Sequence, residues 1–206
     1  MSVTYVDIIV EEPSMEALLR ALLPRLIPDV PFSIYSFQGK DELLERLPDR
    51  LRGYAHWLPE NHRVVVIVDR DDDDCLVLKA RLEAYAQAAG LSTRSHASGD
   101  RFSVINRIAI EELEAWYFGD WEAVRAAFPR VAATIPQQRS FRNPDSVVGG
   151  TWEAFERVLQ RAGYFKTGLR KLEVARSIGP QMDPMRNVSH SFCVLRDAIL
   201  ELGGRL

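Results

Sequence analysis

The sequence predicts an α/β protein, in which an open, mainly parallel sheet is flanked by helices and followed by a mostly helical C-terminal extension. Short apolar runs rich in β-branched residues alternate with helical patterns through the first 120 residues. After that point only helical patterns recur. The length of 206 residues, 47% hydrophobic and 27% charged, suits one α/β domain with an accessory piece. We therefore expect residues 1–120 to form the α/β domain and residues 121–206 to form the extension, packed on that core.

Four segments have the composition of strands. Residues 3–10 and 63–68 are almost continuously apolar, as expected of strands that are buried on both faces. Residues 32–37 alternate between apolar and polar, and residues 102–110 form the fourth segment. Because a helical pattern follows each segment, we expect parallel pairing through helical crossovers.

Helical patterns lie between and after these strands. Ser14 is expected to cap the first helix, and Pro24 and Pro28 are expected to end it. Pro48 is expected to split or bend a second helix over residues 41–58. The remaining helical segments are residues 76–89, which Gly90 should stop, and residues 111–118, 151–161, 168–178 and 188–202.

Several classes of protein are not expected from this sequence. No apolar run is long enough to span a bilayer, and no basic segment precedes an apolar stretch at the N-terminus. Cys75 and Cys193 are too few for a disulfide framework and lack the spacing of a zinc site. These features favour a cytoplasmic protein without a membrane partner. The phosphate-loop motifs are missing, so we do not expect this chain to hydrolyse ATP itself.

The charge is spread unevenly along the chain, although the net charge is only −3. Residues 69–74 (DRDDDD) contain five Asp and one Arg, whereas residues 137–176 contain eight Lys or Arg and four acids. This asymmetry indicates a cation site beside an anion-binding surface. The alternative is that the basic residues only solvate amphipathic helices.

Acidic residues stand where two predicted strands end. Glu11 directly follows the first strand, Asp69 follows the third, and Asp71 comes two residues later. The carboxyl ends of parallel strands meet at one edge of a sheet, and carboxylates gathered there repel one another unless they share a cation. In an extended segment, residues i and i+2 point to the same side, so Asp69 and Asp71 can face one ion. Carboxylate oxygens with open positions predict Mg²⁺ or Mn²⁺.

The acids next to these three are expected to have different roles. Residues 72–74 suit the cap of the next helix, where negative charge is favourable. Glu12 and Glu16 compete with Glu11 for the role at the end of the first strand. Glu11 is favoured because it follows the apolar run directly.

Three segments together resemble the Toprim (topoisomerase–primase) domain. They are residues 8–16 (IIVEEPSME), 65–75 (VVIVDRDDDDC) and 107–120 (RIAIEELEAWYFGD). The chain looks most similar to small stand-alone Toprim-like proteins of bacteria, which are related to OLD-family and RloB-like defence nucleases. The resemblance covers residues 3–120, with a weaker match at residues 164–167. Each motif is short and unspecific by itself, and their order on the expected strands carries the resemblance. It implies a Rossmann-like Toprim sheet.

The Toprim family has a glutamate after its first strand and an Asp-x-Asp after its third, which together bind Mg²⁺. The resemblance therefore implies catalytic and metal-binding roles for Glu11, Asp69 and Asp71, and a role as general acid or base for Glu11. Glu114 is a further candidate metal ligand. Glu12 stands where the family usually has glycine, and its side chain is expected to narrow the site or to add a ligand.

The resemblance therefore implies a divalent-metal-dependent nuclease that cleaves phosphodiester bonds, with DNA as the favoured substrate and RNA as the second possibility. The expected nucleic-acid contacts come from the basic extension, and they are Arg139, Arg142, Lys166, Arg170 and Lys171. Aromatic residues lie among them, and they suit either stacking on a single strand or packing beneath solvated cations; they are Phe141, Trp152, Tyr164 and Phe165. The resemblance implies a role in anti-phage defence with a separate ATPase partner, and a homo-oligomer is left open.

Two alternatives come from other functional classes. The first is a non-catalytic Toprim-like module that docks on or regulates an ATPase, with Glu12 spoiling the site. The second is a receiver-like phosphoacceptor, because acids after the first and third strands also occur there. A receiver would need Ser or Thr after the fourth strand and Lys after a fifth, and the sequence supplies neither.

Overall fold

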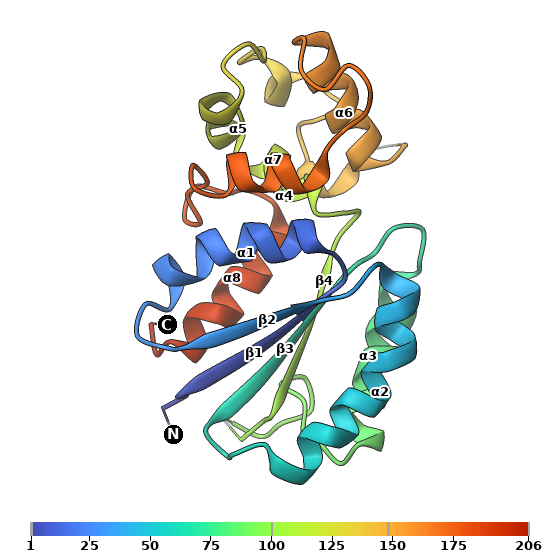
Figure 1. Ribbon diagram of the computed structural model, residues 1–206, viewed down its shortest axis with the longest axis vertical. Coiled ribbons are helices and arrows are strands. Elements are labelled where there is room, and N and C mark those ends of the chain that lie inside the picture. Colours follow the sequence, from blue (N-terminus) through green and yellow to red (C-terminus); the bar gives the residue numbers. More distant parts are fainter. Residues whose placement is uncertain (1, 100, 148, 206) are drawn as a thin grey trace.

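A computed structural model describes residues 2–99, 101–147 and 149–205 of the protein. Its centre is a four-stranded parallel sheet (Figure 1). The strands are β1 (Tyr5–Val10), β2 (Phe32–Ser36), β3 (His62–Asp69) and β4 (Val104–Ala109), in the order β2-β1-β3-β4. Each lies within two residues of its predicted bounds, and the predicted open α/β fold is confirmed.

The strand order reverses between β1 and β3. The chain leaves β1 for β2 on one side and then crosses back to place β3 on the other side. In parallel sheets a crevice forms at such a switch point, beyond the carboxyl ends of the two strands, and ligands bind there. The register pairs Val10 with Ile67, so Glu11 follows β1 at the level where β3 reaches its own end at Asp69.

Helices cover both faces of the sheet (Figure 1). On one face lie α1 (Pro13–Leu26) and α8 (His190–Leu202), and on the other lie α2 (Lys40–Trp57) and α3 (Cys75–Ala88). Successive side chains of a strand point to opposite faces. Accordingly Ile8 packs in the core beneath α1, while Ile9 packs in the core beneath α2.

The other helices form a lobe beyond the carboxyl ends of the strands (Figure 1). They are α4 (Glu114–Gly119), α5 (Trp121–Ala127), α6 (Thr151–Arg161) and α7 (Lys171–Ile178), with short 3-10 turns at Ile135–Gln137 and Pro144–Ser146. Phe118 is central to their packing, with its ring 5.0 Å from that of Phe141 and 5.5 Å from that of Phe155. Helix α7 packs on α1, so the lobe is fixed above the switch point.

Of the expectations about the ends of α1, the one for its start is wrong. Ser14 does not cap α1: the N-cap is Glu12, and Ser14 lies buried in the first turn with its hydroxyl donating to the Glu12 carboxylate. Pro13 occupies the start of the helix, where proline loses no hydrogen bond. Helix α1 ends at Leu26, between the two prolines that were expected to end it, although Pro24 itself lies inside the helix. Burial of Leu22, Leu23 and Leu26 favours the continued helix.

Helix α2 runs without interruption from Lys40 to Trp57 through Pro48. The expected split is therefore wrong, since the flanking Leu47 and Leu51 are both fully buried against the sheet. Two other expectations are confirmed: Asp74 caps α3 by accepting from the amides of Leu76 and Val77, and Gly90 follows that helix with φ +79°.

The helix predicted over residues 111–118 begins only at Glu114. Glu111 has a left-handed backbone with φ +63°, and its carbonyl accepts a hydrogen bond from the amide of Asp71 at 2.9 Å. The residues that follow β4 are thus hydrogen-bonded to the acidic loop of residues 69–74, and α4 begins only after them. Throughout the described residues, no helix is both long and apolar enough to span a membrane.

Candidate functional site

Glu11 and Asp69 lie side by side at the switch point. The backbone amide of Asp69 donates to Glu11 Oε2 at 3.2 Å. The backbone of Glu11 is held in turn by the amide of Gly39, which donates to its carbonyl oxygen at 3.0 Å. The structure therefore brings together the two acids that the sequence places at the ends of separate strands.

Asp69 is a buried carboxylate with incomplete hydrogen bonding. Its side chain belongs to a residue that is 4% exposed, and Oδ2 accepts from the amide of Leu113 at 3.4 Å. Oδ1 is buried and finds no hydrogen-bond partner among the described residues. Burial raises the pKa of Asp69 well above its ordinary value, and the nearby charges of Glu11 and Glu114 raise it further. None of the ion pairs between described residues includes Asp69.

Two other acids share this environment. Burial raises the pKa of Glu11 to about 7, and the charge of Asp71 adds to the effect, against the opposing hydrogen bond from the Asp69 amide. Glu114 is 1% exposed, and its Oε2 has no hydrogen-bond partner in the part of the chain described. Burial raises the pKa of Glu114 to about 7 although Lys171 opposes the change.

Asp71 is turned toward a lysine. Its backbone is left-handed, with φ +48°, so Asp69 and Asp71 do not lie on one extended segment. Lys40 Nζ lies 2.6 Å from Asp71 Oδ2 and 3.0 Å from Asp73 Oδ2, and it also donates to the carbonyl of Arg70 at 3.0 Å. Lys40 begins α2, and sequence reasoning missed it because it follows no strand of the expected site.

Lys171 reaches the acids from the helical lobe. Its Nζ lies 3.7 Å from Glu12 Oε1 and 5.8 Å from the centre of the Trp152 ring. Burial alone lowers the pKa of Lys171, but the negative charges of Glu114 and Glu12 outweigh burial and raise it. Glu12 itself has φ −143°, an extended conformation that any residue adopts, so the backbone at this position does not require glycine.

Two residues that the sequence did not single out complete the surroundings. The Tyr117 hydroxyl is buried without a hydrogen-bond partner among the described residues, and burial raises its pKa well above the ordinary value, as do the charges of Glu114 and Glu12. The Glu112 carboxylate accepts from the Thr151 hydroxyl at 2.7 Å and from the Trp152 amide at 2.8 Å. Glu112 thereby fastens the start of α6 to the edge of the site.

The other predicted nucleic-acid contacts form no ion pair with the acids of the site among the described residues. Arg139, Arg142 and Lys166 are exposed, and none of the ion pairs between described residues includes them. Arg170 is also exposed and pairs with Glu173 at 3.1 Å. The neighbouring aromatic rings pack against the lobe's core, Phe141 on Phe118, and Tyr164 and Phe165 on Phe128.

The acids of the site are the right type of ligand for a hard cation, but their side chains do not converge on one point. Buried carboxylate oxygens without partners, on Asp69 and Glu114, are the ligands that Mg²⁺ or Mn²⁺ prefers. Among residues 2–99, 101–147 and 149–205, however, no three His, Cys, Asp or Glu side chains already converge as a metal site. A cation here would need Asp71 to exchange its partner Lys40 for the ion.

Comparison with known proteins gives one family and one solved structure. A family model described as a domain of unknown function, DUF4276, matches residues 10–199. The C-terminal region of the OLD protein of Xanthomonas campestris pv. campestris is similar, with a TM-score of 0.48 and 15% identity over 95% of this chain and 94% of that chain. No curated protein matches the sequence.

Proposed function

The chain belongs to the DUF4276 family, and we propose that it is a divalent-metal-dependent nuclease of Toprim type that cleaves phosphodiester bonds in DNA. The observation that carries the proposal is the Asp69 carboxylate, buried beside Glu11 with one oxygen lacking a partner among the described residues. Its position at the strand switch point is where ligands bind in parallel sheets. Strongly perturbed acids in such a crevice are typical of catalytic sites.

Glu11, Asp69 and Asp71 would hold the ion, and Glu114 is the fourth candidate ligand. Mg²⁺ or Mn²⁺ would stabilise negative charge that develops on the phosphate oxygens. Asp71 enters this set only by releasing Lys40. The lysine would then be free to pair with a phosphate oxygen at the mouth of the site.

Glu11 suits the role of general acid or base. Its Oε2 accepts from the Asp69 amide, which leaves Oε1 to carry or receive a proton. A pKa of about 7 allows both protonation states near neutral pH. Lys171, on the side of the lobe, supplies a positive charge for a phosphate beside these acids.

The nucleic acid would extend from the site over the basic extension. The exposed side chains of Arg139, Arg142, Lys166 and Arg170 provide charge for backbone phosphates. DNA is the favoured polymer and RNA the second. Because the sequence has no phosphate-loop motif, any dependence on ATP would come from a separate ATPase partner in a defence system.

The test is cleavage of plasmid and single-stranded DNA with Mg²⁺ or Mn²⁺, by the chain alone and with an ATPase encoded beside it. We expect cleavage that a chelator abolishes. Asp69→Asn and Glu11→Gln should lower the rate by at least about a hundredfold. Asp72→Asn is the matched control, since Asp72 is an exposed acid of the same loop. Equal rates in Asp69→Asn and the wild type would refute the proposal.

One observation favours the second candidate, a non-catalytic docking module. Lys40 and Lys171 already pair with Asp71 and Glu12, so the chain neutralises part of its own acid cluster. A docking module would cleave no nucleic acid under any of these conditions. It would bind its ATPase equally well with and without Asp69→Asn.

A further inference from the structure

Strand β4 is the last strand of the sheet, so one of its edges has no neighbouring strand. Its odd-numbered residues bond toward β3, as where the carbonyl of Ala109 accepts from the amide of Arg70 at 2.9 Å. The even-numbered residues therefore direct their amides and carbonyls outward. We propose that the outward edge at Asn106 and Ile108 binds an extended segment of another protein as a fifth strand, with an acidic side chain of that segment beside Arg107.

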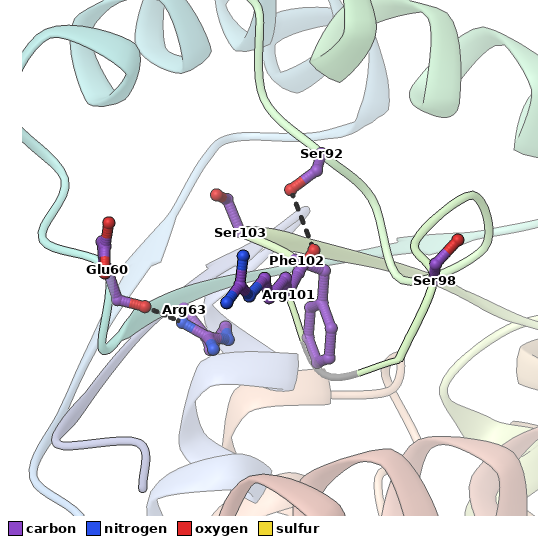
Figure 2. Close-up of a pocket in the computed structure, with 7 residues that line it drawn as sticks. All are labelled: Glu60, Arg63, Ser92, Ser98, Arg101, Phe102 and Ser103. Carbon is purple, nitrogen blue, oxygen red and sulfur yellow. Dashed lines mark hydrogen bonds between the residues drawn. The ribbon is translucent and has the colours of Figure 1, made fainter. Parts of the chain in front are cut away.

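The amino end of β4 is covered by the chain itself, whereas its middle is not. The loop that follows α3 runs alongside this end, and Figure 2 shows Ser92 beside the residues that lead into the strand. The amide of Arg94 donates to the carbonyl of Val104 at 2.8 Å, and the amide of Val104 donates to that of Ser92 at 3.0 Å. The amide of Asn106 and both backbone groups of Ile108 have no hydrogen-bond partner among the described residues. Unpaired groups of this kind are a template for a further strand.

Arg107 gives this edge its charge. Its Nη1 donates to a neighbouring backbone carbonyl at 3.0 Å, its Nε is buried without a hydrogen-bond partner, and it enters no ion pair among the described residues. Burial lowers the pKa of Arg107, against the opposing charges of Glu201 and Glu83. Arg94 already pairs with the first of these acids at 2.9 Å, and Lys79 pairs with the second at 2.7 Å. A carboxylate from another protein would supply the charge that this guanidinium lacks.

An apolar hollow of about 240 Å³ adjoins the same edge. Its wall includes Ile108, Leu76 of α3 and Val194 of α8, and the last two are 80% and 39% exposed. Small-molecule sites are larger, at roughly 300–1,000 Å³, so the hollow suits one apolar side chain of a bound segment. Successive side chains of a strand point to opposite faces, and residues opposite each other share a face. The residue opposite Ile108 should therefore be apolar and should directly adjoin the acid opposite Arg107.

A second copy of the chain fits this edge poorly through its own β4. Two β4 strands related by a twofold axis would pair antiparallel, with their outward backbone groups facing each other. The residue opposite Arg107 would then be Ile105, Ala109 or a second Arg107. The first two carry no charge, and two arginines directly opposite each other repel. Charge complementarity therefore favours a different protein, whose extended segment carries an acid next to an apolar residue.

The probe is the acetylated and amidated peptide Ser-Thr-Val-Glu-Val-Thr-Ser, which reads the same in both directions and so suits parallel and antiparallel pairing. Isothermal titration of the full chain should show saturable binding at one site. Replacing the glutamate of the peptide with glutamine, or Arg107→Gln in the protein, should each weaken binding by about tenfold, since a charge-assisted contact is lost. The two changes together should weaken binding no further than either one. Arg52→Gln, at an exposed position on α2, is the matched control and should bind as the wild type does.

Amide hydrogen exchange, followed by NMR, separates strand addition from binding elsewhere. The Ile108 amide should exchange at least about tenfold more slowly with the peptide bound, whereas the Arg107 amide, which faces β3, should not change. Lack of saturable binding would overturn the proposal, and so would equal affinity for the glutamate and glutamine peptides. A dimeric chain in which the Ile108 amide is already protected without peptide would assign the edge to a second copy and would also overturn it.

Discussion

Replacing Glu114 with glutamine should stabilise the protein when no metal is present. Glu114 is 1% exposed with a partnerless Oε2 among the described residues, and burial raises its pKa to about 7. A folded-state pKa above the unfolded value of about 4.5 means that the folded protein holds the proton more tightly. Stability is therefore lost as the pH rises from about 4 to about 7. Glutamine has no proton to lose and avoids this cost.

The size of the effect follows from the same two values. The difference between about 7 and 4.5 corresponds to roughly 3 kcal/mol at pH 8, and to less than about 1 kcal/mol at pH 4.5. For a chain of this length, about 3 kcal/mol raises Tm by roughly 6–12 °C.

The assay is urea and thermal unfolding of the wild type and Glu114→Gln in a chelator at pH 4.5 and pH 8. Glu45→Gln, at an exposed position, is the control and should change stability by no more than about 0.5 kcal/mol. A Glu114→Gln variant that is no more stable than the wild type at pH 8 would refute the reasoning. An equal gain at both pH values would attribute the change to packing instead of charge.

Two further predictions concern other acids. Mg²⁺ should raise the Tm of the wild type in a concentration-dependent way but leave the Tm of Asp69→Asn unchanged. Differential scanning fluorimetry, with Ca²⁺ and Na⁺ as control ions, measures both. At Glu83, burial opposes ionisation, but hydrogen bonds from Lys79, Thr93 and Asn106 prevail and lower the pKa to about 2. An acid whose pKa is lower in the folded than in the unfolded state stabilises the fold at pH values above its unfolded pKa. In urea titrations, the free energy of unfolding of the wild type should therefore exceed that of Glu83→Gln by roughly 3 kcal/mol at pH 6 and by roughly half of that at pH 3. An advantage that does not change with pH would contradict this.

The strands β1 and β3 were predictable because each is an almost continuous apolar run, and β2 because apolar and polar residues alternate along it. The same runs predicted Glu11 and Asp69 as neighbours, since parallel strands align their carboxyl ends without any information from the rest of the chain. Helix ends were harder to predict. Pro24 and Pro48 are local signals for termination, but burial of leucines on α1 and α2 outweighs one lost hydrogen bond at each proline.

No pattern in the sequence predicted that two lysines would lie at the site. Lys40 begins α2 and Lys171 begins α7, and both reach the acids only because their helices pack where they do. Lys171 was expected on a nucleic-acid surface, and no spacing in the sequence indicated Glu12 as its partner. Contacts between elements so distant in the chain depend on tertiary packing, which periodicity cannot specify.

The acid cluster opposes folding, and this opposition is itself evidence about function. A core built only for stability would not bury Asp69 and Glu114 with partnerless oxygens, because each raises the free energy of the folded state at neutral pH. Nor do the two lysines remove the cost, since Glu11 and Glu114 still have pKa values of about 7 with both in place. A bound divalent cation would relieve the remaining repulsion among the acids. Local features that destabilise a fold in this way concentrate where a protein binds or reacts.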